Sequence, residues 1–311
     1  MFVRLRSVYV VLILTGIVFS LGGCSKKPSW EKEIITEEIL LPGLKEEYNF
    51  LFLTDTHIIA STENEPEEAY EGIWERREHY STENGVYSVD QFADWIECAN
   101  KKGVDSVLLG GDIIDSPGES NLEFLDEQFA NLEVPYLYTP GNHDWTRPDE
   151  YRTEKAYNEF LPRLEKYMNG NTAIQKVDIG ELRIIAVDNS DTQFDEQSVK
   201  EYEKYLQTDQ KVIVLIHIPL ITQSVLERAR EVWDSRVVLG GESYGGLLPE
   251  EFSRKFMDLT AAENSPVELI LAGHVHFHDK DYFVGGKDVL QIVGPAGFEG
   301  KAVHLTIKGT Q

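Results

Sequence analysis

Five short motifs place carboxylate, amide and imidazole side chains directly after apolar runs of the sequence. In chain order they are Asp55-Thr56-His57, Gly111-Asp112, Gly141-Asn142-His143-Asp144, His217 and Gly273-His274-Val275-His276. They contain five of the eight His residues of the chain. Oxygen and imidazole ligands without a thiolate suit Mn, Fe, Zn or Co rather than a cysteine-rich structural zinc site. The motifs therefore indicate a mixed oxygen and nitrogen metal site, provided that the fold brings them together.

The apolar runs before these motifs are predicted strands, and the amphipathic segments between them are predicted helices. We expect strands over residues 48–54, 104–109, 134–139, 181–187, 211–216, 268–272, 289–293 and 302–307, and an edge strand within 37–44. Helices are expected over residues 88–102, 122–132, 150–167, 198–207, 226–233 and 252–262. This alternation predicts an α/β fold, in which functional groups collect at the carboxyl ends of the strands.

Several residues near the motifs have a simpler interpretation as structural residues. Asp115 and the segment 188–190 follow strands and are expected to form turns or caps. Cys98 lies on an amphipathic helical pattern and is expected to be a small core residue. Residues 60–87 form an acidic, aromatic insertion, which we expect to be a surface loop beside the candidate site.

Taken together over residues 55–276, the ordered motifs resemble the calcineurin-like metallophosphoesterase family. The resemblance implies an α/β fold built as a four-layer α/β/β/α sandwich, with two mixed β-sheets flanked by helices. It also implies two divalent metal ions. Asp55, His57 and His276 would hold the first ion, Asn142, His217 and His274 the second, and Asp112 would bridge both. His143 would then protonate or stabilise the leaving oxygen, and Asp144 would either orient His143 or cap the turn.

Two ions roughly 3.5–4 Å apart bind phosphate oxygens and activate a water to hydroxide near neutral pH. The expected activity is therefore hydrolysis of a phosphomonoester or phosphodiester, which is the chemistry of a phosphoric ester hydrolase. Two alternatives stay open at this point: a non-catalytic lipoprotein that binds metal or phosphorylated ligands, and a metal-dependent amidohydrolase of the envelope. Tyr80, Trp145, Trp233 and Tyr244 are candidates to line a substrate pocket, although aromatic residues more often pack in the core or on the surface.

The N-terminal residues predict export and lipidation. Arg4 and Arg6 precede an apolar stretch over residues 8–21, which ends in Leu21-Gly22-Gly23-Cys24 and resembles a bacterial lipoprotein signal. We therefore expect a signal peptide over residues 1–23, a lipid anchor on Cys24, a tether over 24–46 and one metallophosphoesterase domain over 47–311. The protein would be anchored to a membrane outside the cytoplasm of a bacterium.

The charge of the chain limits the classes of partner. The formal net charge is −25, with 54 acidic and 29 basic residues. Loss of Arg4 and Arg6 with the signal peptide would change it by two, to −27. Such a surface repels nucleic acid, so no nucleic-acid-binding surface is expected. A phosphorylated small molecule or envelope substrate would need a local positive centre, which a metal cluster provides.

Overall fold

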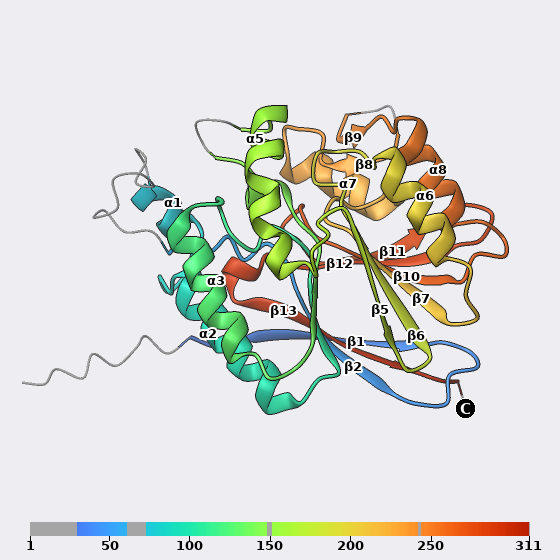
Figure 1. Ribbon diagram of the computed structural model, residues 1–311, viewed down its shortest axis with the longest axis horizontal. Helices are drawn as coiled ribbons and strands as arrows, with labels where there is room; N and C mark the ends of the chain where they lie inside the picture. The colour runs from blue at the N-terminus through green and yellow to red at the C-terminus, as the bar shows by residue number, and fades with distance from the viewer. Residues whose placement is uncertain (1–29, 61–72, 148–150, 242–243, 311) are drawn as a thin grey trace, which may run out of the picture.

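Two β-sheets packed face to face form the centre of the molecule (Figure 1). The computed structural model describes residues 30–60, 73–147, 151–241 and 244–310. The first sheet has the order β1 (Glu33–Leu40), β13 (Lys301–Lys308), β2 (Tyr48–Leu53), β3 (Ser106–Leu109) and β4 (Tyr136–Tyr138). The second has the order β11 (Asp279–Phe283), β12 (Val289–Val293), β10 (Val267–Ala272), β7 (Lys211–Leu215), β6 (Leu182–Val187) and β5 (Ile174–Ile179).

Both sheets are mixed. Strands β2, β3 and β4 run parallel, and β13 pairs antiparallel to β2 and parallel to β1. In the second sheet β6, β7, β10 and β12 are parallel, and the edge strands β5 and β11 are antiparallel to their neighbours. A small third sheet joins β8 (Val238–Leu239) and β9 (Gly246–Leu247).

The helices lie on the outer faces of the two sheets (Figure 1). The first sheet carries α2 (Ser88–Lys102), α3 (Glu119–Asn131), α5 (Glu154–Phe160) and the 3₁₀ helix η1 (Leu161–Tyr167). The second carries α6 (Glu196–Tyr205), α7 (Gln223–Val232) and α8 (Glu251–Thr260). The short helices are α1 (Ile73–His79), α4 (Asn142–Trp145) and η2 (Gly297–Glu299).

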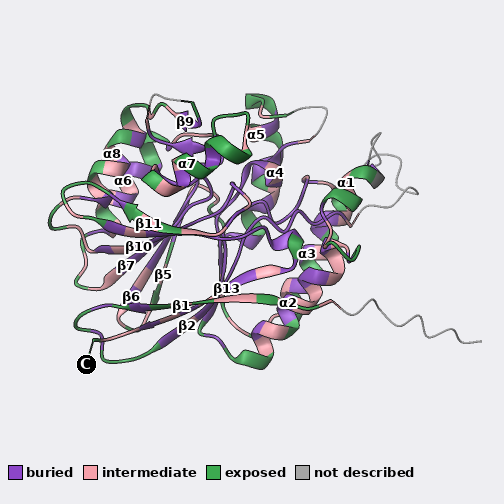
Figure 2. Ribbon diagram, turned by 180° about the vertical axis from the view of Figure 1, so that it is seen from behind, coloured by how far each residue is buried: buried purple, intermediate pink, exposed green. Residues whose placement is uncertain are grey.

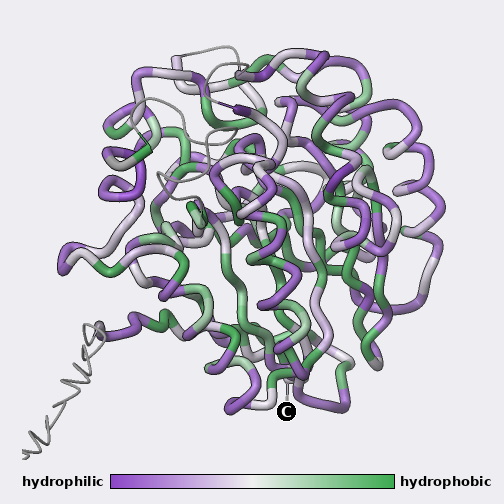
Figure 3. The backbone as a smooth tube through the Cα atoms, turned by 60° about the vertical axis from the view of Figure 1, so that its left-hand side comes forward, coloured by the Kyte–Doolittle hydropathy of each residue, from purple (hydrophilic) through white to green (hydrophobic). Residues whose placement is uncertain are grey.

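Three apolar layers hold these elements together, and the most deeply buried residues follow the strands (Figure 2). Between the sheets, Phe50 and Phe52 of β2 pack with Leu215 and Leu271 of the second sheet. Each outer layer joins helices to one sheet, as where Trp95 of α2 packs beside the first sheet. Hydrophobic stretches follow the central strands, while the helices alternate in hydropathy (Figure 3). The four-layer α/β/β/α sandwich predicted from the resemblance is therefore confirmed.

The structure differs from the sequence prediction at several edges. Strands β5 and β11 were not predicted, because both carry charged residues and have few buried positions. Strand β1 lies within the segment predicted as a tether and pairs along its whole length with β13, so residues 33–40 belong to the sheet. The predicted helix over 150–167 begins at residue 154, where the Thr153 side chain caps it, and becomes a 3₁₀ helix at Leu161. Pro162 lacks the N–H that an α-helix would use there.

The predicted signal peptide and Cys24 lie outside the described residues. Among the residues that the structure does describe, no helix is long and apolar enough to cross a membrane. Cys98 lies on α2, as predicted, and is half-buried. Its side chain packs against the apolar layer between α2 and the first sheet.

Candidate metal centre

The five motifs meet where the two sheets present the carboxyl ends of their strands. Asp55 follows β2, Asp112 follows β3 and Asn142 follows β4, while His217 and His274 follow β7 and β10 of the second sheet. All five side chains are at least nine-tenths buried. The site joins segments that are up to 219 positions apart in the chain. For example, the backbone N–H of His274 donates a hydrogen bond to the Asp55 carboxylate.

The backbone at the ligand positions is left-handed. Values of φ are +53° at Asp55, +42° at His57, +51° at Asp112, +72° at His274 and +59° at His276. This conformation costs a residue other than glycine about 1–2 kcal/mol, and such residues cluster at functional sites. The backbone at His274 and His276 therefore does not continue the extended strand. Tight left-handed turns aim the two imidazoles into the two groups of possible ligands described below.

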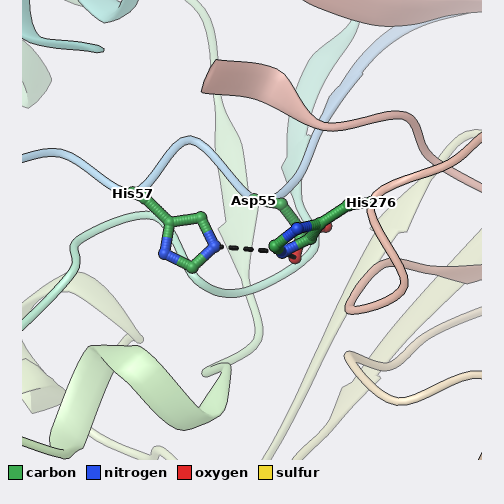
Figure 4. A group of neighbouring side chains, drawn as sticks. All are labelled: Asp55, His57 and His276. Atoms are coloured by element: carbon green, nitrogen blue, oxygen red, sulfur yellow. Dashed lines mark hydrogen bonds and ion pairs between the residues drawn. The ribbon is translucent and has the colours of Figure 1, made fainter. Parts of the chain in front are cut away.

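One group of possible ligands consists of Asp55, His57 and His276 (Figure 4). The Nε2 atoms of His57 and His276 lie 3.2 Å apart. The His276 Nε2 is also 3.5 Å from Oδ1 of Asp55. Figure 4 shows the two rings approaching from different segments, with the carboxylate beside them. Two imidazole nitrogens at this distance form a favourable contact only through a shared proton or a shared cation.

A second group consists of Asp112, His217 and His274. The His217 Nδ1 lies 2.8 Å from the Gly110 carbonyl, which fixes its proton there and leaves Nε2 as the ligand atom. That Nε2 is 3.2 Å from both Asp112 Oδ2 and His274 Nδ1. Asp112 Oδ2 also lies 3.8 Å from His57 Nε2 of the first group. Asp112 thus stands between the two groups, as a bridging ligand must.

Asn142 supplies a further test of whether these residues fit two cations. Its Nδ2 donates to Tyr151 at 3.2 Å, but its Oδ1 is buried and accepts no hydrogen bond. An orphaned buried oxygen is costly, and a bound cation beside the second group would satisfy it. With two facing imidazole pairs and a central carboxylate, the donor set fits two divalent ions.

The protonation states agree with this assignment. Burial lowers the pKa of His57 to about 4 and also lowers the pKa of His274 and of His276, so these rings are neutral and offer lone pairs. Burial would also lower the pKa of His217, but the Asp112 charge outweighs it and raises this pKa to about 9. Burial opposes ionisation of Asp112 too, yet His217 and His143 hold its pKa well below the ordinary value. A cation would displace the proton that His217 and Asp112 hold between them.

The His143 ring lies against His57 of the first group, with 4.6 Å between ring centroids, and its partner is Asp115. The His143 Nδ1 is 3.0 Å from Asp115 Oδ1, and the His57 Nδ1 is 3.4 Å from the same oxygen. Arg76 of α1 donates through Nε to the other oxygen of Asp115 at 2.7 Å. Burial would lower the pKa of His143, but Asp112 and Asp115 outweigh it and raise that pKa. Asp115 therefore orients one candidate ligand and, together with Asp112, favours the protonated form of the neighbouring His143 imidazole.

Asp144 does not orient His143, so that prediction is wrong. Its carboxylate accepts backbone N–H groups of Gly141 at 2.6 Å, Asp112 at 3.0 Å, Ile113 at 2.9 Å and Ile114 at 3.0 Å. The alternative expectation, a capping role, is the one that the structure supports. Asp144 joins the turn after β3 to the turn after β4 and so fixes Asp112 relative to Asn142.

Glycine is needed at two points of this junction. A Cβ on Gly141 would overlap the backbone N of Asp112, and a Cβ on Gly111 would lie 2.5 Å from Nδ1 of His217.

Asn189, which follows β6, supports the same region, because its Oδ1 accepts the backbone N–H groups of His217 and Ile218 at 3.0 Å each. The segment 188–190 thus supports the site without lining it.

A cavity of about 330 Å³ opens over the ligands. Its lining residues are His79, Tyr80, Asp112, Asn142, His143, Tyr151, Arg152, Trp233, Ser235, Arg236, Val237, His274 and His276. Of the aromatic candidates, Tyr80 and Trp233 line it; Tyr80 stacks on His57 at 4.1 Å between ring centroids. Trp145 is instead fully buried and donates to Ser190, and Tyr244 lies on the surface. His79 and Tyr80, from the described part of the insertion over 60–87, therefore contribute part of the cavity wall.

Asp115 and Arg76 are the site residues that sequence reasoning missed. Asp115 lies three positions after Asp112 and looked like a turn residue. The available signal was a second carboxylate close behind a candidate ligand, which carries little weight without a known partner.

Comparisons with known proteins agree with this geometry. The family model described as calcineurin-like phosphoesterase matches residues 48–278. The solved structure of a dimetal phosphatase from Danio rerio has a similar fold, with a TM-score of 0.50, 14% sequence identity, and coverage of 81% of this chain and 88% of that chain. Comparison with curated proteins gave no match. The chain belongs to the calcineurin-like phosphoesterase family.

Proposed function

We propose that this chain hydrolyses phosphomonoesters or phosphodiesters at the candidate metal centre. The observation that carries the proposal is the position of Asp112, whose Oδ2 lies 3.2 Å from His217 and 3.8 Å from His57. A carboxylate between two sets of imidazole and oxygen donors provides for two divalent ions, and we propose Mn, Fe, Zn or Co. When bound, such a pair supplies Lewis acidity toward phosphoryl oxygens and activates water near neutral pH.

The chain's own residues supply the rest of the chemistry. Asp55, His57 and His276 would hold one ion, and Asn142, His217 and His274 the other, with Asp112 shared. Asp115 holds Nδ1 of His143, which leaves Nε2 of this protonated ring to donate to the oxygen of the leaving group. A protein that only bound metal would have no use for this donor, so the arrangement favours action on a phosphate ester over metal binding alone.

The full chain, purified in detergent, tests the proposal. We expect it to release p-nitrophenol from p-nitrophenyl phosphate or its bis-ester when one of the four metals is added. Asp112→Asn should lose both turnover and about half of the bound metal. Asp126→Asn is the control, because Asp126 is exposed on the outside of the molecule, where it pairs with Lys166 and lies near Tyr167, and it does not line the cavity. Absence of turnover with every metal, or a fully active Asp112→Asn, would refute the proposal.

We further propose that the protein is a bacterial lipoprotein, held outside the cytoplasm by a lipid on Cys24. The N-terminal pattern over residues 4–24 supports this. Its substrate would then be a phosphorylated small molecule or envelope component, and the charge of −25 speaks against nucleic acid. Radiolabelled palmitate should enter the wild-type chain but not Cys24→Ser. Labelling of both forms would refute this assignment.

A further inference from the structure

Two arginines on the cavity wall make no hydrogen bond or ion pair with the described part of the chain, although Arg152 lies 5.5 Å from the centroid of the Tyr151 ring. Among the arginines of the described ranges, Arg152 and Arg236 alone make no hydrogen bond or ion pair, and both line the cavity over the metal ligands. Others are matched, as Arg183 is by Asp178 and Arg163 by Glu119. In a chain with 54 acidic and 29 basic residues, two unmatched guanidinium groups at one cavity are a notable departure.

Arg152 is held in place at a cost. Its φ is +52°, in the left-handed region, and its Nε is buried without a hydrogen-bond partner. A buried donor left unpaired costs roughly 1–3 kcal/mol, more where the group is charged. A strained backbone and an unsatisfied buried donor at a cavity wall indicate that a ligand completes the arrangement.

The scissile phosphate does not account for these charges. Two divalent ions against the Asp55 and Asp112 carboxylates leave two positive charges, which match the dianion of a phosphomonoester. Arg76 is already matched by Asp115. Arg152 and Arg236 therefore present two further positive charges that a single phosphate group does not match. Neither makes an ion pair within the described ranges, although the Asp191 carboxylate is near enough to Arg152 for the arginine charge to act on its pKa.

We propose that Arg152 and Arg236 form a second anion-binding subsite, which takes a second phosphate group of the substrate. Arginine matches phosphate oxygens through paired N–H donors, so two arginines suit a phosphate group well. The cavity volume of about 330 Å³ limits the substrate to a small molecule with its two phosphate groups close together. This inference rests on the proposed function, since it names the substrate class for the same site.

Binding of phosphonates tests the subsite without turnover. The full chain loaded with Mn is titrated in a calorimeter with propane-1,3-bisphosphonate and with propylphosphonate, which lacks the second anion. We expect the bisphosphonate to bind at least tenfold more tightly. Arg236→Gln should remove most of this advantage and leave propylphosphonate binding within twofold. Arg236 is exposed, so this variant should fold even if Arg152→Gln does not.

The matched control is Arg254→Gln. Arg254 is also exposed, but it lies on α8 and donates to the Pro249 carbonyl, away from the cavity. It should keep the wild-type preference. Equal affinity of the wild type for both phosphonates would overturn the subsite. So would an equal loss for both ligands in Arg236→Gln, or the same loss in Arg254→Gln, because these results indicate non-specific attraction.

Turnover provides the second readout. Propane-1,3-diol bisphosphate should have a kcat/KM at least tenfold above that of propane-1,3-diol monophosphate, and Arg236→Gln should bring the two values together. A wild type that hydrolyses both equally refutes the subsite and leaves the proposed function standing. If neither compound nor p-nitrophenyl phosphate is hydrolysed with any metal, the proposed function fails, and the phosphonate titration still decides the subsite.

Discussion

Replacement of Asp115 by Asn removes a charge at the point where α1, a candidate ligand and the proposed proton donor meet. The Asp115 carboxylate lies 3.0 Å from Nδ1 of His143, 3.4 Å from Nδ1 of His57 and 2.7 Å from Nε of Arg76. An Asn side chain has the same shape as Asp but only one acceptor oxygen. Its amide N–H groups would face N–H groups of His143, His57 or Arg76, which are donors as well. His143 then loses one of the two charges that favour its protonated form, since Asp112 remains, and it loses the contact that orients its ring.

The magnitude follows from the contacts that are lost. A hydrogen bond to a charged group contributes about 1.5–3 kcal/mol, and each 1.4 kcal/mol is a factor of about ten. General acid assistance contributes roughly 10²–10⁴ to a rate. We therefore expect kcat for an alkyl phosphate to fall by about 10², because an alkoxide leaves only when protonated. p-Nitrophenolate leaves without a proton, so kcat for p-nitrophenyl phosphate should fall less than tenfold, by about a factor of three.

The assay measures phosphate release from methyl phosphate and from p-nitrophenyl phosphate at saturating Mn, with metal content determined on the same sample. Saturating metal matters because His57 also loses its partner, and such changes weaken metal binding by about 10–100-fold. Asp126→Asn serves as the control and should behave as wild type. An Asp115→Asn variant that loses the same factor with both leaving groups would refute the reasoning, since Asp115 would then act only through His57. Unchanged turnover of methyl phosphate would also refute it.

Three further predictions concern stability. Asp144→Ala should lower the free energy of unfolding by about 3 kcal/mol or more, because several buried N–H groups lose their acceptor. Denaturant titration measures this change. A loss under about 1 kcal/mol would contradict the role of Asp144 in joining the turns after β3 and β4. Burial raises the pKa of Asp188 to about 6, so its favourable contribution is present at low pH and is lost as pH rises through 6. Asp188→Asn should therefore stabilise the protein by about 2 kcal/mol at pH 8 and change little at pH 4, and a pH-independent change in Tm would contradict this. Chelation of metal should lower Tm by about 5 °C or more, and added Mn should restore it, since ligands of the folded state stabilise it by mass action. A Tm that chelator leaves unchanged would show that the ligand cluster holds no metal in the folded chain.

The fold and the ligand set were accessible from the sequence to different degrees. Buried strands such as β7, with an unbroken apolar run, were predicted within a residue or two of their bounds. The edge strands β5 and β11 were missed because their charged residues leave them no apolar run. The sandwich itself came from the resemblance, since strand periodicity says nothing about how two sheets stack.

The identity and order of the metal ligands are properties of the sequence. Residue type sets ligand chemistry, and a polar residue directly after an apolar strand lies at the strand's carboxyl end whatever the rest of the fold does. Asp55, His217 and His274 could be recognised in this way before any coordinates were known. The same reasoning could not choose between Asp115 and Asp144 as the partner of His143.

That choice depends on contacts between segments about 30 residues apart in the chain. Asp144 is next to His143 in sequence, but helix α4 turns its carboxylate inward, onto backbone N–H groups 30 to 32 residues away. Asp115 reaches His143 because the left-handed turn at Asp112 redirects the chain after β3 toward α1 and the cavity. Hydrogen bonds are short-ranged and directional, so the partner of a side chain depends on the path of the backbone in space, which neighbouring positions in a sequence do not specify.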